Sequence, residues 1–304
     1  MSMFDQFKDI EARDEIPIVE STIEKLLALE TKVINAHLEN RWVDDQTREL
    51  ERIYTKIITQ VREELPLQLT EEILQEYIDC RENRETDRAA KIRGMYSAAL
   101  VDMFQEQNPD TPLTIDGNGR RWNYLFYHVK KVKYLNLTNV RGEYILAFAG
   151  TERGSIEDVI VQNIEGDNLF TNAATFYGKM KKVTFQNCSG EELFFNMGAH
   201  DGTVNTIFLD NIKGRIALGI TFDEKEDTEK LYLKNPDKSP LAFTTNNNLT
   251  KRKKILLHEN CAQEKSSIVQ EIETLTGEMI SKTKEEPKKG YEVLSKLYER
   301  LFED

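Results

Sequence analysis

A 24-residue period runs through the middle and later part of the chain, and it limits the fold more than any other feature. When the sequence is shifted by this period, one asparagine falls on another without a gap, at Asn139, Asn163, Asn187, Asn211 and Asn235. Three residues after the asparagine, the first four copies carry a glycine, at Gly142, Gly166, Gly190 and Gly214. The last copy has Lys238 at this position. Self-similarity at a fixed spacing indicates stacked repeats that bury their apolar faces against one another.

Each copy also carries apolar residues four and two positions before the asparagine, as a strand with one buried face requires. They are Leu135, Val159, Val183, Ile207 and Leu231, followed by Leu137, Val161, Phe185, Leu209 and Leu233. Stacked parallel coils lie about 4.8 Å apart, so equivalent residues form columns. The pattern resembles right-handed parallel β-helices and predicts about five 24-residue coils. An irregular 22-residue first coil, with Gly117 in the asparagine's place, is expected before them.

The repeat divides the chain into an N-terminal helical domain over 1–107, a β-helix over 108–248 and C-terminal helices over 249–304. Apolar residues at spacings of three and four predict four helices before residue 107 and two after residue 259. The terminal coils of a solenoid expose an unpaired sheet edge, which invites polymerisation. We therefore expect the helices at both ends to act as caps.

The asparagine column has two interpretations. An Asn side chain tolerates the left-handed backbone of a tight bend, and stacked amides can bond to one another. This favours an internal ladder that fixes the register of the coils. The alternative is a ligand-binding or ice-binding face.

Three outward columns next to the asparagine could carry catalytic or metal-binding chemistry, and they begin at Thr138, Asn136 and Tyr134. None of the three places two carboxylates on adjacent coils, as a calcium site or an acid pair would require. The three cysteines lie far apart, the four histidines are scattered, and no nucleotide-binding or nucleophile motif occurs. No catalytic residue, metal site or cofactor is predicted.

Two outward features suggest contacts with partners. The first is an apolar column, which is either offered to a partner or covered by the protein's own helices: Ile160, Phe208 and Tyr232. The second is basic charge among aromatic residues near the ends of the repeat, which either suits phosphate contacts and base stacking or belongs to solvated linkers beside the capping helices. These residues are Arg120, Arg121, Trp122, Lys130, Lys131, Lys133, Lys251, Arg252, Lys253 and Lys254.

The composition narrows the setting and leaves several functions open. The net charge of −12 argues against a surface that coats nucleic acid, and no apolar run is long enough to span a membrane. An acidic N-terminus without a hydrophobic signal core favours the cytoplasm. The first hypothesis is a non-enzymatic scaffold that docks protein partners. The second is an RNA- or ribosome-associated factor, and the third a carbohydrate-active enzyme. The oligomeric state stays open, including dimerisation through the N-terminal helices.

Overall fold

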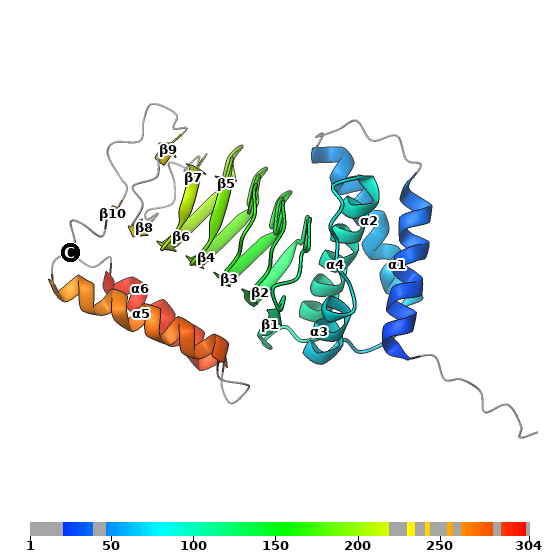
Figure 1. Cartoon of the computed structure of the whole chain (residues 1–304), viewed down its shortest axis with the longest axis horizontal. Coiled ribbons are helices and arrows are strands. Elements are labelled where there is room, and N and C mark those ends of the chain that lie inside the picture. Colours follow the sequence, from blue (N-terminus) through cyan, green and yellow to red (C-terminus); the bar gives the residue numbers. More distant parts are fainter. Residues whose placement is uncertain are drawn as a thin grey trace, which may run out of the picture.

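The computed structural model describes residues 21–38, 47–218, 230–234, 241–243, 254–257, 263–281 and 287–301. It is a parallel β-solenoid of about four turns with helices before and after it in the chain (Figure 1). This confirms the predicted fold class, with fewer turns than the five expected. Part of the last predicted coil, including Asn235, lies outside the described residues.

Within the described residues, four helices precede the solenoid, as predicted: α1 (Thr22–Leu38), α2 (Thr47–Glu64), α3 (Glu71–Asp79) and α4 (Arg88–Gln107). Their starts follow from local chemistry. The Thr70 side chain accepts the N–H of Ile73 at the start of α3, and Asp87 accepts that of Ala90 at the start of α4. Such N-caps satisfy backbone donors that have no partner inside the helix.

The main sheet has seven parallel strands, in the order β1, β2, β3, β4, β6, β8 and β10. Their bounds are β1 Leu113–Asp116, β2 Lys131–Thr138, β3 Ser155–Gln162, β4 Lys179–Gln186, β6 Thr203–Asp210, β8 Lys230–Lys234 and β10 Lys254–Leu257. Leu135 pairs with Val159, which is the predicted 24-residue register. Leu113 pairs with Leu135 and Asp116 with Thr138, so the 22-residue first coil is confirmed, and Gly117 follows in the place that Asn139 takes in the next coil.

A second sheet of three strands forms on a later part of the coils. It contains β5 (Ser189–Leu193), β7 (Lys213–Leu218) and β9 (Leu241–Phe243). The main sheet also continues past residue 248, the predicted end of the solenoid. Lys254 pairs with Lys230, again one full period apart, so the period outlasts the asparagine column that was used to find it.

The segment that follows Gly142 has an irregular backbone, which the next two coils share. Between Tyr144 and Gly150 alternate residues have a positive φ, and the equivalent stretch from Asn168 to Ala174 repeats this. Leu146 donates its N–H to the preceding coil, at Leu125, and Tyr144 donates to the following one. Hydrogen bonds between coils therefore hold bulky residues in a backbone conformation that is locally disfavoured.

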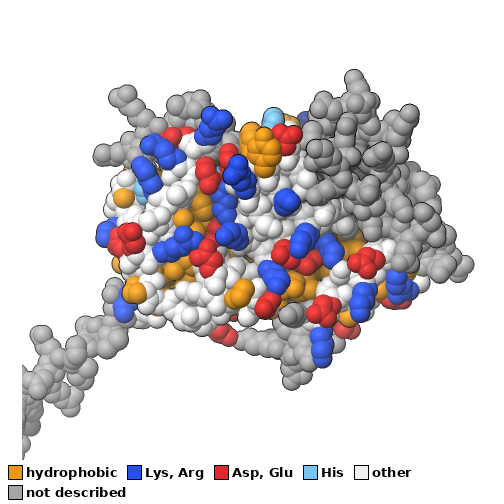
Figure 2. Space-filling view, turned by 180° about the vertical axis from the view of Figure 1, so that it is seen from behind, with side chains coloured by type: hydrophobic (Ala, Val, Ile, Leu, Met, Phe, Trp, Pro, Cys, Tyr) orange, Lys and Arg blue, Asp and Glu red, His pale blue; other side chains and the backbone are white. Residues whose placement is uncertain are grey.

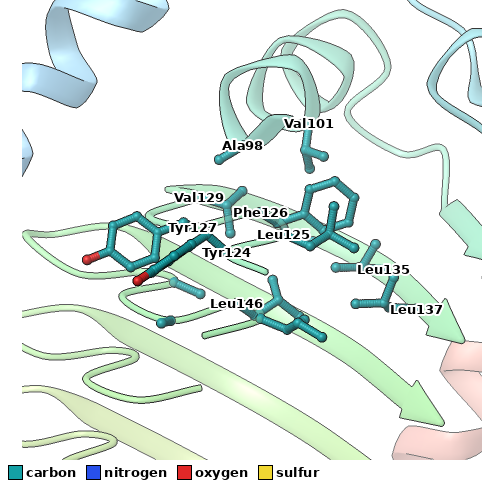
Figure 3. Packing of buried hydrophobic residues seen from close by; sticks show 14 of the residues in the cluster. Ala98, Val101, Tyr124, Leu125, Phe126, Tyr127, Val129, Leu135, Leu137 and Leu146 are labelled. Carbon is teal, nitrogen blue, oxygen red and sulfur yellow. The ribbon is translucent and has the colours of Figure 1, made fainter. Parts of the chain in front are cut away.

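One hydrophobic core fills the solenoid and continues into the N-terminal helices. The two apolar columns predicted to point inward are buried throughout the coils whose side chains are described. Figure 3 shows Ala98 and Val101 of α4 above Phe126 and Val129 of the first coil. Full burial of each such aliphatic side chain contributes about 1.5–3 kcal/mol. The N-terminal helices are therefore packed into the same core as the solenoid.

Side chains of α4 also serve as acceptors for backbone N–H groups on the part of the solenoid edge that β1 does not reach. The acceptors are Ser97, Asp102 and Gln105, and the donors are the N–H groups of Phe126, Lys130, Lys131 and Lys133. Buried backbone donors without partners are costly. The predicted cap at the N-terminal end is confirmed.

The C-terminal helices, α5 (Gln263–Ser281) and α6 (Pro287–Leu301), correct the prediction of a second cap. They lie across the outer face of the main sheet, alongside the stack (Figure 1). Their apolar residues pack on Tyr134 of β2, Ile160 of β3 and Phe208 of β6. The two helices therefore span several coils of the main sheet. None of the described helices has the length and apolar character needed to cross a membrane.

Candidate binding groove

The asparagine ladder exists, but it lies at the surface. Asn163, Asn187 and Asn211 each donate an amide hydrogen bond to the asparagine of the preceding coil, over 2.6–3.2 Å. The ladder begins at Asp116, which accepts from Asn139. Their φ angles of 51–55° confirm the left-handed bend. Asn163 and Asn187 are exposed, so the expectation of an internal ladder was wrong. The bend turns these side chains out of the coil, while the next residue in each coil points inward.

The glycine column beside the ladder is imposed by the stacking of the coils. A Cβ at Gly166 would lie 1.6 Å from the carbonyl oxygen of Gly142, and one at Gly190 would lie 1.9 Å from that of Gly166. No side chain fits between coils at these distances, so the column stays bare. A bare strip between two rows of side chains is a groove.

The two walls of the groove are charged. One wall contains Arg141, Glu165 and Ser189, which are paired across adjacent coils. The other carries a carboxylate on each of three adjacent coils, at Glu143, Asp167 and Glu191. This column lies outside the three outward columns considered in the sequence, and its 24-residue spacing would have revealed it.

Ion pairs connect the walls to their neighbours. Arg121 lies 3.3 Å from Glu143, and Arg141 lies 3.4 Å from Glu165. The side chains of Arg141 and Glu165 are 66% and 69% exposed, so solvent screening leaves this pair weak and open to rearrangement. Asp167 instead accepts the backbone N–H of Glu191 at 2.7 Å, which fixes its position.

The groove has a volume of about 820 Å³ and runs from the loop at Glu82 and Arg84 to Ser189. Its lining residues include three arginines and four carboxylates, and none of them is aromatic. A surface of this kind offers separated charges of both signs on a rigid floor. Among the described residues, no group of three or more His, Cys, Asp or Glu side chains is arranged to hold a metal ion.

Two buried ionisable groups with strongly shifted pKa values lie between α2, α4 and the first coil. Burial raises the pKa of Asp102 to about 7, although the Tyr54 hydroxyl donates to it over 2.6 Å. Burial also lowers the pKa of His128 to about 4, and its Nε2 lies 2.9 Å from Glu51. Lys130 forms an ion pair with the same glutamate. These groups hold the helices on the first coil and do not line the groove.

Comparison with known proteins finds no matching family model, curated sequence or solved structure. Function has to be inferred from the geometry and chemistry of this chain.

The predicted basic cluster near the first coil is divided among separate ion pairs. Arg120 lies 3.9 Å from Asp79, Arg121 pairs with Glu143, Lys130 with Glu51, and Lys133 lies 2.5 Å from Asp110; Lys131 is exposed. On the face in Figure 2, basic and acidic side chains are interspersed. These residues do not form one basic patch.

Trp122, the aromatic member of that cluster, is fully buried against Tyr77, with ring centroids 6.0 Å apart. It is not exposed to stack on a base. Lys251, Arg252 and Lys253 lie outside the described residues, and Lys254 begins β10, where its side chain is not described.

The apolar column is covered by the protein's own helices, the second of the two alternatives. Ile160 and Phe208 are 1% and 0% exposed and belong to the cluster formed with α5 and α6. Tyr232 lies in β8, and its side chain is not described. A partner could reach this column only after the two helices have moved.

Proposed function

We propose that the chain is a non-enzymatic scaffold that binds an extended segment of a protein partner in the glycine-floored groove. The observation that carries the proposal is the pair of charged walls on either side of a floor that cannot hold side chains. In this proposal the coil is right-handed, the sense that parallel crossovers favour, and the setting is cytoplasmic.

The signs of the charges favour a polypeptide over other ligands. A nucleic-acid backbone carries one sign of charge and would meet four carboxylates in the lining, whereas a polypeptide can present both signs. Sugar ligands commonly stack on aromatic side chains, and the lining residues include none. The net charge of −12 further favours a partner with basic residues.

A matched pair of charge exchanges tests the proposal. Exchanging Arg141 and Glu165, as Arg141→Glu with Glu165→Arg, alters the groove and keeps its total charge. The control exchanges Glu157 and Lys181, a pair 3.0 Å apart on the exterior. Both changes are expected to leave stability within about 1 kcal/mol, since exposed ion pairs contribute little.

The three proteins are compared by affinity purification from the native cell, with and without RNase. We expect a defined set of proteins to be recovered by the parent and the exterior variant, lost by the groove variant, and unaffected by RNase. Equal recovery by the groove variant would exclude the groove as the site. Recovery that requires intact RNA would instead support the RNA-associated hypothesis.

A further inference from the structure

One carboxylate of the groove differs from the other charged groups that line it, because it has no ionic partner. Three arginines and four carboxylates line the groove. Ion pairs join all but one of these groups, as Arg84 with Glu82, Arg121 with Glu143, and Arg141 with Glu165. The carboxylate that remains is Asp167, which forms no ion pair with another of the described residues. An unneutralised carboxylate between two walls attracts a positively charged ligand.

The backbone holds Asp167 in place. Its Oδ1 accepts the N–H of Glu191, in the following coil, over 2.7 Å. Glu143 and Glu191 stand in the same column, one coil away on either side, at a stacking distance of about 4.8 Å. These neighbours add negative charge around Asp167, and the hydrogen bond limits the freedom of its carboxylate. A group that is already ordered loses little entropy when it binds a ligand.

The preceding coil shows how a basic side chain fits across the floor. Arg121 and Glu143 lie on opposite walls, so the ion pair between them, at 3.3 Å, crosses the floor. One coil further on, Arg141 takes the place of Arg121, and Asp167 takes that of Glu143. Arg141 pairs with Glu165 on its own wall instead. The crossing contact that the chain makes at Glu143 is therefore not repeated at Asp167.

A basic side chain fits this position better than a metal ion or a phosphate group. A calcium ion requires six or more oxygen ligands, and among the described residues no group of three His, Cys, Asp or Glu side chains is arranged to hold a metal. The column of three carboxylates would repel a phosphate. A lysine or arginine needs only one carboxylate for a charge-assisted hydrogen bond.

We propose that the segment bound in the groove presents one lysine or arginine side chain to Asp167, and that this contact selects the partner. The basic side chain crosses the floor to Asp167 as that of Arg121 crosses it to Glu143. This inference rests on the proposed function, because the segment has to lie in the groove to reach Asp167. It adds the type of partner residue that is recognised and the carboxylate that recognises it.

The test uses the full chain and four pools of labelled octapeptides as the probe. Each pool is random except at one central residue, which is fixed as arginine, lysine, glutamine or glutamate. Fluorescence anisotropy measures the dissociation constant of each pool. We expect the arginine and lysine pools to bind the parent at least about tenfold more tightly than the glutamine pool, and the glutamate pool to bind no more tightly than the glutamine pool.

Three variants assign this preference to one carboxylate. Asp167→Asn removes the charge and keeps an oxygen that can accept the N–H of Glu191, so the preference for arginine over glutamine should fall below about twofold. Glu157→Gln makes the same change in net charge on the exterior and should keep the preference of the parent. Asp167→Lys is expected to reverse the preference, so that the glutamate pool binds more tightly than the arginine pool.

The outcomes separate this inference from the proposed function. A preference for arginine that survives both Asp167→Asn and Asp167→Lys overturns the inference. Equal binding of the four pools by the parent also overturns it, but leaves the groove as a peptide site. If the parent binds none of the pools, the proposed function fails and the inference fails with it. If Asp167→Asn does not fold, the reversal by Asp167→Lys decides, and its absence overturns the inference.

Discussion

The N-terminal and C-terminal helices both cover the solenoid, but they are attached to it in different ways. The N-terminal helices share one hydrophobic core with the coils, and α4 supplies acceptors to backbone donors of the first coil. The C-terminal helices form a separate cluster on an outer face, where side-chain hydroxyls meet side-chain polar groups. A backbone donor has no substitute partner once it is buried, whereas an outward side chain can return to water. We therefore expect the first contact to be lost only when the solenoid unfolds, and the second to separate at a lower cost in free energy.

The largest difference between the two regions is expected when the same charge is placed in each of them. Val101→Asp puts a carboxylate into the shared core, where the parent side chain is 0% exposed, and is expected to cost about 4 kcal/mol or more. Leu297→Asp is expected to release α5 and α6 while the rest of the chain keeps its stability within about 1 kcal/mol. Urea unfolding followed by circular dichroism measures both. Equal losses in the two variants would contradict the distinction.

A smaller effect is expected from removing one hydrogen-bonding group in each region. Asp102→Ala leaves two backbone N–H groups and the Tyr54 hydroxyl without their acceptor, at a cost of about 3 kcal/mol in global stability. Tyr291→Phe leaves only Asn136 without its donor and is expected to cost about 1 kcal/mol, confined to docking of α6. Thermal unfolding distinguishes the two variants, because only Asp102→Ala should lower the midpoint temperature of the main unfolding transition.

The smallest effect concerns pH. Burial raises the pKa of Asp158, a sheet residue near α6, to about 6, with Lys182 opposing the shift and Glu157 adding to it. A raised pKa means that the covered state binds the proton more tightly than the open state. Docking should therefore strengthen as the pH falls through 6, by about 1 kcal/mol between pH 7 and 5. Hydrogen exchange of α6, corrected for the intrinsic rates, measures the change. Asp158→Asn should remove it, and a docking energy that weakens on acidification would contradict the assignment.

The sequence alone predicted the features that depend on repetition. The spacing of Asn139 and its equivalents predicted the register between coils, and Gly117 correctly marked the irregular first coil. Local patterns of apolar spacing also predicted the helices. These predictions succeeded because each rests on a periodicity or on a contact between near neighbours in the chain.

Features that depend on distant contacts were missed or wrong. A 24-residue spacing shows that the asparagines stack, but not whether the bend directs them inward or outward. Positive φ angles at residues such as Tyr144 and Phe148 depend on hydrogen bonds between coils and contradict local preference. The burial of Trp122 likewise depends on helices that precede it by tens of residues.

The same limit applies to the groove. The three arginines of the groove lining and the glycine column can be recognised in the sequence. The carboxylates that form ion pairs with these arginines cannot. Glu143 and Arg121 lie nearly a full period apart in the chain and meet only through the stacking of two coils. The carboxylate column was open to prediction from its period, and the groove that it borders follows from the close approach of the glycines.

Native-state hydrogen exchange with mass spectrometry on the parent chain tests the central claim most directly, through the amides of α4 and α6 under one set of conditions. The account predicts that α4 exchanges only when the whole chain unfolds, whereas α6 opens at a free energy lower by about 2 kcal/mol or more. During that opening, β2, β3 and β4 should keep their protection. Equal protection of α4 and α6, changing together with added urea, would contradict the account.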